Sequence, residues 1–119
     1  MLPSLQRKCY QEFQHALEQL HKRVAATDLE VAAFRDEFRD LQQLFQSQIV
    51  SLSADDFDPD FAYRWQSFQT EIYKQMRLLE TDVMLLQASR SPATTLARAS
   101  GVSDRIKTLI QYCEALLQL

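Results

Sequence analysis

Apolar residues recur along the first half of the chain in alternating steps of four and three. The repeat consists of Phe13, Leu17, Leu20, Val24, Thr27, Val31, Phe34, Phe38, Leu41, Phe45, Gln48 and Leu52. Steps of four and three keep apolar side chains on one face of an α-helix, the apolar seam. The sequence has one glycine and three prolines, so we expect helices joined by short connections and no strands.

Prolines and acidic residues indicate where the other helices begin and end. The first helix should begin near Pro3 or Ser4, because proline suits the first turn of a helix. Residues 53–60 form the clearest loop, since they combine proline with four aspartates. Ser91 and Pro92 have the residue types of an N-cap and a first helical residue, which places the end of the preceding helix near residues 89–90.

Two further apolar seams follow this loop. The first consists of Phe61, Trp65, Phe68, Ile72, Leu79, Val83 and Leu86, and the second of Leu96, Ala99, Val102, Ile106, Leu109, Cys113 and Leu116. Leu5 and Cys9 extend the seam of the first helix towards the N-terminus. Gly101 lies inside the last seam, where a kink with Ser103 as a new cap is one option.

The connection near Thr27 decides the architecture. The heptad phase continues through Thr27, yet Thr27 and Glu30 have the spacing of a capping box. One alternative is a single helix of about 50 residues, about 75 Å long, plus two shorter helices. The other has a tight turn here and gives four helices of about 23, 24, 29 and 26 residues, as an up-down-up-down bundle requires.

We favour the all-α, up-down-up-down four-helix bundle, as one domain spanning residues 1–119. A 50-residue helix would leave about 20 residues of apolar seam without a partner unless the protein dimerised. The bundle buries that seam within one chain, so we expect a monomer. It also brings Cys9 and Cys113 into the same layer of the core, because the first helix starts at the end where the fourth finishes.

Charge and hydropathy argue against nucleic-acid and membrane partners. Residues 1–60 carry 6 basic and 11 acidic side chains, and residues 61–119 carry 7 and 5. A nucleic-acid-binding face is strongly basic, whereas Arg90, Arg98, Arg105 and Lys107 are few and scattered. No stretch approaches the ~20 apolar residues of a membrane span, and the first residues lack the apolar region of a signal peptide. We expect a cytoplasmic protein.

Three patterns resemble metal sites but lack what such sites need. Asp56, Asp58 and Asp60 occupy the first three ligand positions of a calcium loop, but Phe61 and Ser67 replace its glycine and final glutamate. Two Glu-x-x-His pairs, Glu12 with His15 and Glu18 with His21, match half of a di-iron site. That site needs ligands from several helices, and both pairs lie on one. We expect a solvated turn and a solvated helix face, with no metal.

The sequence also predicts no enzyme activity, no catalytic residue and no cofactor. A single glycine cannot build a phosphate-binding loop, and neither histidine is placed for a Ser-His-Asp arrangement that the sequence could reveal. Cys9 and Cys113 lack metal or redox spacing and lie on apolar seams, so we expect both to be reduced core residues. Trp65 and Phe68 should be central to the core next to the acidic loop.

One surface strip is the candidate for function. It lies on the helix after the acidic loop, on the face opposite the apolar seam, and consists of Tyr63, Gln66, Thr70, Tyr73, Arg77 and Met84. Tyrosine and arginine are enriched among binding hot spots, and methionine adapts to partner surfaces. Since Tyr73 and Arg77 are expected to point outwards, replacing both should leave stability nearly unchanged while weakening partner binding. The face around Arg98, Arg105 and Tyr112 is the next candidate.

Three segments of the C-terminal half carry a family resemblance. They are residues 66–88 (QSFQTEIYKQMRLLETDVMLLQA), residues 91–94 (SPAT) and residues 104–113 (DRIKTLIQYC). Together they resemble the PatD family of small cyanobacterial heterocyst-frequency control proteins; the N-terminal half matches only in length and helical character. The resemblance implies a non-enzymatic cytosolic regulator of cell differentiation that contacts the tubulin-like division protein FtsZ. The alternative is a structural coiled-coil oligomerisation module, which would use the long helix.

Overall fold

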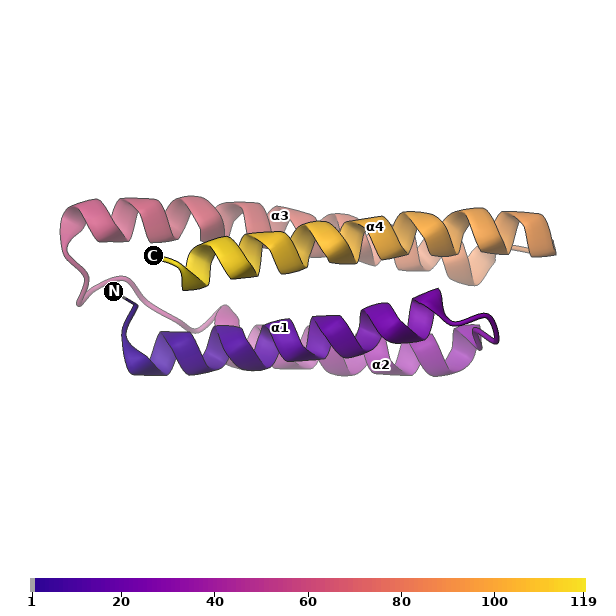
Figure 1. Ribbon diagram of the computed structural model, residues 1–119, viewed down its shortest axis with the longest axis horizontal. Coiled ribbons are helices and arrows are strands. Elements are labelled where there is room, and N and C mark those ends of the chain that lie inside the picture. Colours follow the sequence, from indigo (N-terminus) through magenta and orange to yellow (C-terminus); the bar gives the residue numbers. More distant parts are fainter. Residues whose placement is uncertain (1) are drawn as a thin grey trace.

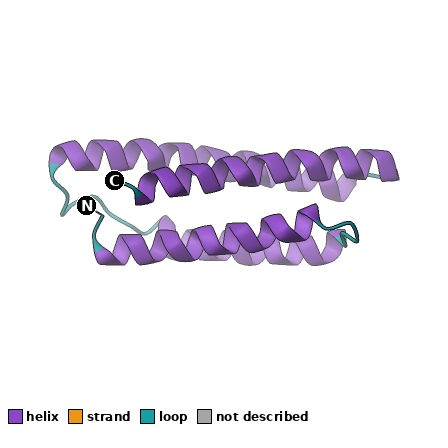
Figure 2. Cartoon of the chain, in the orientation of Figure 1, coloured by secondary structure: helices purple, strands orange, loops and turns teal. Residues whose placement is uncertain are grey.

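The computed structural model describes residues 2–119 and confirms the four-helix bundle. The elements are α1 (Ser4–Ala25), α2 (Val31–Leu44), a π-helical continuation η1 (Phe45–Ile49), α3 (Pro59–Ala88) and α4 (Pro92–Leu117). Successive helices run in opposite directions, and α1 packs between α2 and α4 while α3 packs against α4 and α2 (Figure 1). The rod measures 51 × 19 × 18 Å, with its connections at the two ends (Figure 2).

The chain turns between Ala25 and Val31, so the alternative of one 50-residue helix is wrong. The predicted capping box is wrong as well: Glu30 holds the N-cap position of α2, and its side chain makes no capping hydrogen bond. Leu29 is half-buried against the core and anchors the turn. The half-exposed ion pair between Arg23 and Glu37, 2.6 Å apart, joins α1 to α2 beside it.

The helix start predicted at Ser91 is confirmed. Its Oγ accepts a hydrogen bond from the backbone N–H of Thr94 over 3.1 Å, and Pro92 is the first helical residue. The kink considered at Gly101 does not occur, because α4 runs through this residue without interruption. A Cβ at Gly101 would meet no other atom within 4 Å, so packing does not require a glycine there.

The π-helical segment η1 alters the heptad phase at the end of α2. The Val50 N–H donates to the Phe45 carbonyl, five residues earlier, over 3.0 Å. A π turn accommodates one more residue than an α turn. Ile49 is therefore fully buried one turn after Phe45, whereas the predicted seam residue Gln48 is half-buried.

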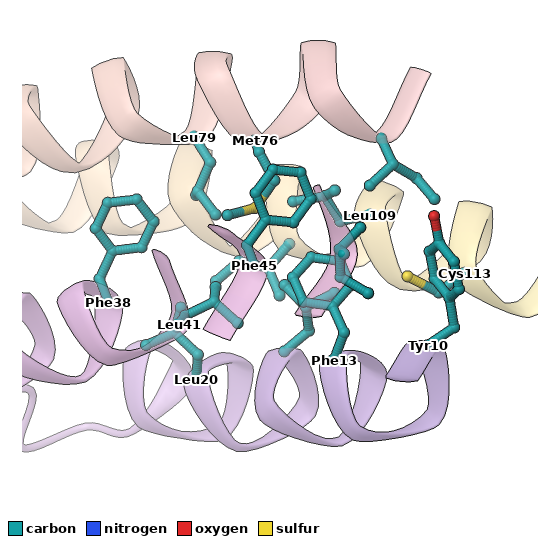
Figure 3. Packing of buried hydrophobic residues seen from close by; sticks show 14 of the residues in the cluster. Tyr10, Phe13, Leu20, Phe38, Leu41, Phe45, Met76, Leu79, Leu109 and Cys113 are labelled. Carbon is teal, nitrogen blue, oxygen red and sulfur yellow. The ribbon is translucent and has the colours of Figure 1, made fainter. Parts of the chain in front are cut away.

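The core follows the predicted seams through most of their length (Figure 3). Three seam predictions are wrong: Leu5 is 63% exposed and Leu96 is 75% exposed, and Thr27 is exposed in the turn after α1. The hydrogen bond between His21 and Ser103 fixes the register of α1 against α4, and α1 ends four residues after His21. The first turns of α4, which include Leu96, therefore project beyond α1 (Figure 1). At the other end, Leu2 and Tyr10 are buried in addition to the predicted residues.

Aromatic rings close the end of the bundle next to the acidic loop. Trp65 is buried, and the ring of Phe57 meets the rings of Trp65 and Phe61 edge-on at centroid distances of 5.3 and 5.0 Å. The loop before α3 thus covers Trp65 through Phe57. Phe68 is only half-buried against this core, so its predicted central position is only partly realised.

Tyr10 occupies a core layer with both cysteines. Figure 3 shows its side chain next to Cys113, and its hydroxyl has no hydrogen-bond partner among residues 2–119. Burial raises the pKa of Tyr10, and the nearby Cys113, Tyr73 and Cys9 raise it further. His21 of α1 contacts Ser103 of α4, and Cys9 and Cys113 lie 12 and 10 residues from this pair towards the same end of the rod. At 1.5 Å per residue the two cysteines are therefore at nearly the same height, as the bundle topology predicts.

The first prediction concerns Trp65. Its replacement by alanine should lower the free energy of unfolding by about 3–5 kcal/mol, since it removes a buried aromatic side chain and leaves a cavity. Denaturant titration of the parent and of Trp65→Ala measures the change. Leu5→Ala is the matched control, because an exposed leucine should contribute less than about 0.5 kcal/mol. Equal stability of the two variants would show that the aromatic cluster does not support the fold.

The second prediction concerns the buried thiols. Burial, with a smaller contribution from Glu114, raises the pKa of Cys113 from its ordinary 9.0 to about 12, and burial also raises that of Cys9. Only a thiolate attacks a disulfide reagent. At pH 8 the folded protein should therefore react slowly with DTNB, with Cys9 ahead of the more deeply buried Cys113.

The same shifts fix a pH dependence of stability. The folded protein holds the thiol proton more tightly than the unfolded chain, so this stabilisation is complete below pH 9 and is lost as the pH rises towards 12. Melting temperatures measured from pH 8 to pH 11 should fall, and Cys113→Ala should reduce the slope. The DTNB experiment has its own contradicting outcome. Full DTNB labelling of the native protein within the time that the denatured protein needs would contradict the buried placement of the two thiols.

Candidate functional site

The strip predicted on α3 lies mostly at the surface. Tyr63 is 78% and Met84 62% exposed, and Gln66, Thr70 and Arg77 are also exposed. Tyr63, Thr70, Arg77 and Met84 are spaced seven residues apart, so they lie along one line of the helix, about 32 Å long at 1.5 Å per residue. The structure therefore brings these residues onto one continuous surface.

Tyr73 differs from its expected outward position. Its ring is half-buried and meets Phe45 edge-on, with centroids 5.3 Å apart. Its hydroxyl accepts a hydrogen bond of 3.4 Å from Gln69 Nε2. Burial raises the pKa of Tyr73, and the bond from Gln69 offsets part of this rise. The expected outward position of Tyr73 is wrong, because Phe45 of η1 covers its ring, and replacing Tyr73 should now cost stability.

Two shallow depressions flank the ridge formed by Tyr73 and Arg77. One, of about 300 Å³, lies between α2, η1 and α3; besides the ridge it is lined by Gln42, Phe45, Gln46, Val50, Met76 and Glu80. The other, of about 550 Å³, lies on the open side of α3 and is lined also by Thr70, Lys74, Leu78 and Thr81. A partner side chain could enter either depression without moving a helix.

Sequence reasoning missed two residues of this surface. Leu78 and Leu85 are 36% and 41% exposed. Each is the first residue of a Leu-Leu pair whose second member is fully buried. The signal was present in the sequence, since two adjacent helical residues cannot both lie on one narrow seam. Together with Tyr63 and Met84, they make the outer side of α3 unusually apolar for a helix surface.

The basic side chains of this surface form no ion pair with any residue in the described range 2–119. Lys74 and Arg77 are exposed and take part in none of the ion pairs formed within residues 2–119. Arg64 lies near the start of the strip, with its guanidinium 5.9 Å from the centre of the Phe61 ring. Their charges are therefore free to interact with an approaching molecule.

The alternative face on α4 is less available than expected. Arg105 Nε donates to Asp82 over 2.8 Å, and its Nη1 donates to Gln75 over 3.2 Å. This network joins α3 to α4, and Tyr112 is half-buried. Of the three residues proposed for that face, only Arg98 remains fully exposed.

A depression of about 810 Å³ lies at the end where α4 projects beyond α1. Its apolar lining includes Val24, Leu29, Leu96 and Ala99. Ser103, which also lines it, is 3.0 Å from His21 Nε2. His21 and Ser103 are far apart in sequence, so only the fold could reveal this pair. His21 is half-buried, whereas the sequence predicted a solvated position. No carboxylate within residues 2–119 hydrogen-bonds to His21, so the orienting group of a catalytic triad is missing.

The patterns that resemble metal sites lie largely in solvent. Asp56, Asp58 and Asp60 are all exposed, and so is His15. Asp58 precedes α3 without a capping hydrogen bond, and Asp60 lies in its first turn, where a negative charge favours the helix dipole. Over the described residues, no three His, Cys, Asp or Glu side chains are placed to share a metal ion. None of the described helices is both long and apolar enough to cross a membrane.

No family model, curated protein or solved structure matches this chain. The site therefore has to be judged from the chain's own residues, and the outer surface of α3 is the candidate that they define best. It combines exposed apolar side chains, positive charges that form no ion pair within residues 2–119 and depressions beside a continuous helix of 30 residues. The resemblance to the PatD family stays a prediction based on the three sequence segments given above.

Proposed function

We propose that this protein is a non-enzymatic cytoplasmic regulator that acts by binding another protein through the outer surface of α3. This surface, called the α3 surface below, consists of Tyr63, Gln66, Thr70, Lys74, Arg77, Leu78, Met84 and Leu85. Binding would use a face that folding leaves uncovered. No part of the bundle would have to open.

One observation carries the proposal: exposed apolar side chains are concentrated on α3. Of the seven large apolar residues exposed within residues 2–119, four lie on this helix. Leu5 and Leu96 lie singly near opposite ends of the bundle. Scattered apolar residues are normal on a protein surface, whereas several on one helix face are typical of a binding surface.

The family resemblance supports a particular partner. The segment of residues 66–88 carries the resemblance to the PatD family and also contains most of the α3 surface. That resemblance implies contact with FtsZ, a tubulin-like protein of cell division, and a role in heterocyst differentiation. A regulator of a polymer needs only to bind subunits and bias their lateral association. It requires no chemistry of its own.

The second candidate, an oligomerisation module, receives less support. It required a long first helix whose apolar seam would need a second chain. In the structure α1 ends at Ala25, and its seam is buried against α2 and α4 of the same chain. We therefore favour a monomer that binds a different protein.

The third prediction tests this function by co-sedimentation with polymerised FtsZ. The double variant Tyr63→Ala, Met84→Ala should bind about tenfold more weakly or worse, because exposed aromatic and methionine anchors supply much of a small interface's affinity. Its melting temperature should remain close to that of the parent, since both side chains are exposed. Tyr73 is left intact because its ring supports the fold.

The matched control is Leu5→Ala, Leu96→Ala, which removes two equally exposed apolar side chains away from α3. This control should co-sediment like the parent. Parent protein that stays in the supernatant at every FtsZ concentration would contradict FtsZ as the partner. Equal weakening by both double variants would contradict the assignment to α3.

A further inference from the structure

We propose that the α3 surface recognises an acidic amphipathic helix of its partner, which lies lengthwise along α3. This inference rests on the proposed function in that it takes α3 as the binding surface. It adds the shape and charge of the partner segment. Tyr63 and Met84 would contact its apolar ends, and Lys74 and Arg77 would pair with carboxylates near its middle.

The spacing of the surface fits a helix better than an extended peptide. Tyr63, Thr70, Arg77 and Met84 recur every seven residues, and a second α-helix packed at a small angle meets side chains at this interval. The line from Tyr63 to Met84 is about 32 Å long, which corresponds to a partner helix of about 21 residues. α3 extends over 30 residues without a break, so it offers a straight support over this length.

The charges of the surface favour an acidic partner. Between Tyr63 and Met84, Glu80 is the one exposed acidic residue and Glu71 is half-buried, whereas Arg64, Lys74 and Arg77 are exposed bases. Asp82 in the same stretch is already paired with Arg105 on the opposite flank. Complementary charge steers encounter and rejects wrong partners. An acidic helix is attracted by this surface, and a basic helix is repelled.

The same charges argue against a second copy of this chain. If two α3 helices packed antiparallel about a two-fold axis near their middles, Lys74 and Arg77 of each copy would face those of the other. Like charges in contact cost binding energy. The apolar positions at either end could pair, but four positive charges would meet at the centre. The surface is therefore suited to a different protein.

Two synthetic helices test the inference directly. Both are 21-residue peptides with a helix-forming alanine and glutamine background and leucines at the two ends. The acidic peptide carries two central glutamates in the register of Lys74 and Arg77, and the basic peptide carries lysines there. Because each peptide has leucines at both ends and its charged residues in the middle, it can bind α3 in a parallel or an antiparallel orientation.

Methyl NMR of methionine reports binding at the site itself. Met84 is exposed on the α3 surface, whereas Met76 is buried beneath the neighbouring depression, so the two signals separate contact from a general change. At low salt the acidic peptide should shift the Met84 methyl signal in a saturable way, and the basic peptide should not. Raising the salt concentration should weaken the acidic peptide, because salt screens exposed charges.

Charge reversal provides the paired variant. Lys74→Glu, Arg77→Glu should weaken binding of the acidic peptide about tenfold or more and should create binding of the basic peptide. Arg98→Glu, Lys107→Glu is the matched control, since it makes the same change of charge at exposed positions of α4. It should bind the acidic peptide like the parent. The comparison of the two peptides on the parent protein stands even if a variant folds poorly.

A Met84 signal that neither peptide moves, or that both move equally, overturns the inference. The result is independent of FtsZ. Binding of the acidic peptide without co-sedimentation would support the inference and remove FtsZ as the partner. Co-sedimentation without peptide binding would support the proposed function and overturn the inference.

Discussion

The packing of α4 against both α1 and α3 holds this bundle together. α4 is the helix in contact with both long neighbours, and its seam from Ala99 to Leu116 is buried throughout. Each fully buried leucine or isoleucine contributes about 1.5–3 kcal/mol through the hydrophobic effect. The hydrogen bonds from Arg105 of α4 to Asp82 and Gln75 of α3 set the register between these two helices. Once α1, α3 and α4 are packed in this way, α2 fills the remaining position between α1 and α3.

The limited length of α2 shapes the functional surface. α2 and η1 together span residues 31–49, whereas α3 has 30 residues. Phe45 of η1 covers Tyr73, whereas towards the first turns of α3 the loop before this helix reaches Trp65 through Phe57. Tyr63 lies on the outer face of α3, opposite the buried seam, and is left in solvent. The α3 surface stays exposed because it faces away from the bundle, and the shorter α2 and η1 cover only its edge at Tyr73.

Most of the fold could be predicted from the sequence, because it depends on patterns that are local. Heptad spacing predicted the helices and most of the core, and Ser91 with Pro92 predicted the start of α4. The errors arose where the outcome depends on a neighbouring element. Leu96 continues a perfect seam, yet α1 ends too early to cover it. The π turn of η1, which buries Ile49 in place of Gln48, has no clear signature in the sequence.

The candidate site shows the same division. Heptad counting placed Tyr63, Arg77 and Met84 at the surface, as the structure has them. It could not show that η1 covers Tyr73, because that contact depends on the register between α2 and α3. The pair of His21 and Ser103 could not be foreseen for a similar reason, since it joins α1 to α4. Local patterns thus predict which residues share one face of a helix. Only the packing of the helices decides which of these residues stay exposed to solvent.

The buried polar atoms without partners have a consequence for how the molecule moves. Tyr10 Oη, Trp65 Nε1 and Gln69 Oε1 are buried without a hydrogen bond within residues 2–119. The first two turns of α1 and of α3, which carry Tyr10 and Trp65, lie towards the end of the rod that holds both chain termini (Figure 1). A buried polar group without a partner costs about 1–3 kcal/mol, and water can satisfy it when the structure opens locally. This end should therefore exchange its amide protons before the end with the two helix–helix turns. Tyr63 lies at this end, so a partner bound to it would also reduce local opening of the bundle there and slow amide exchange.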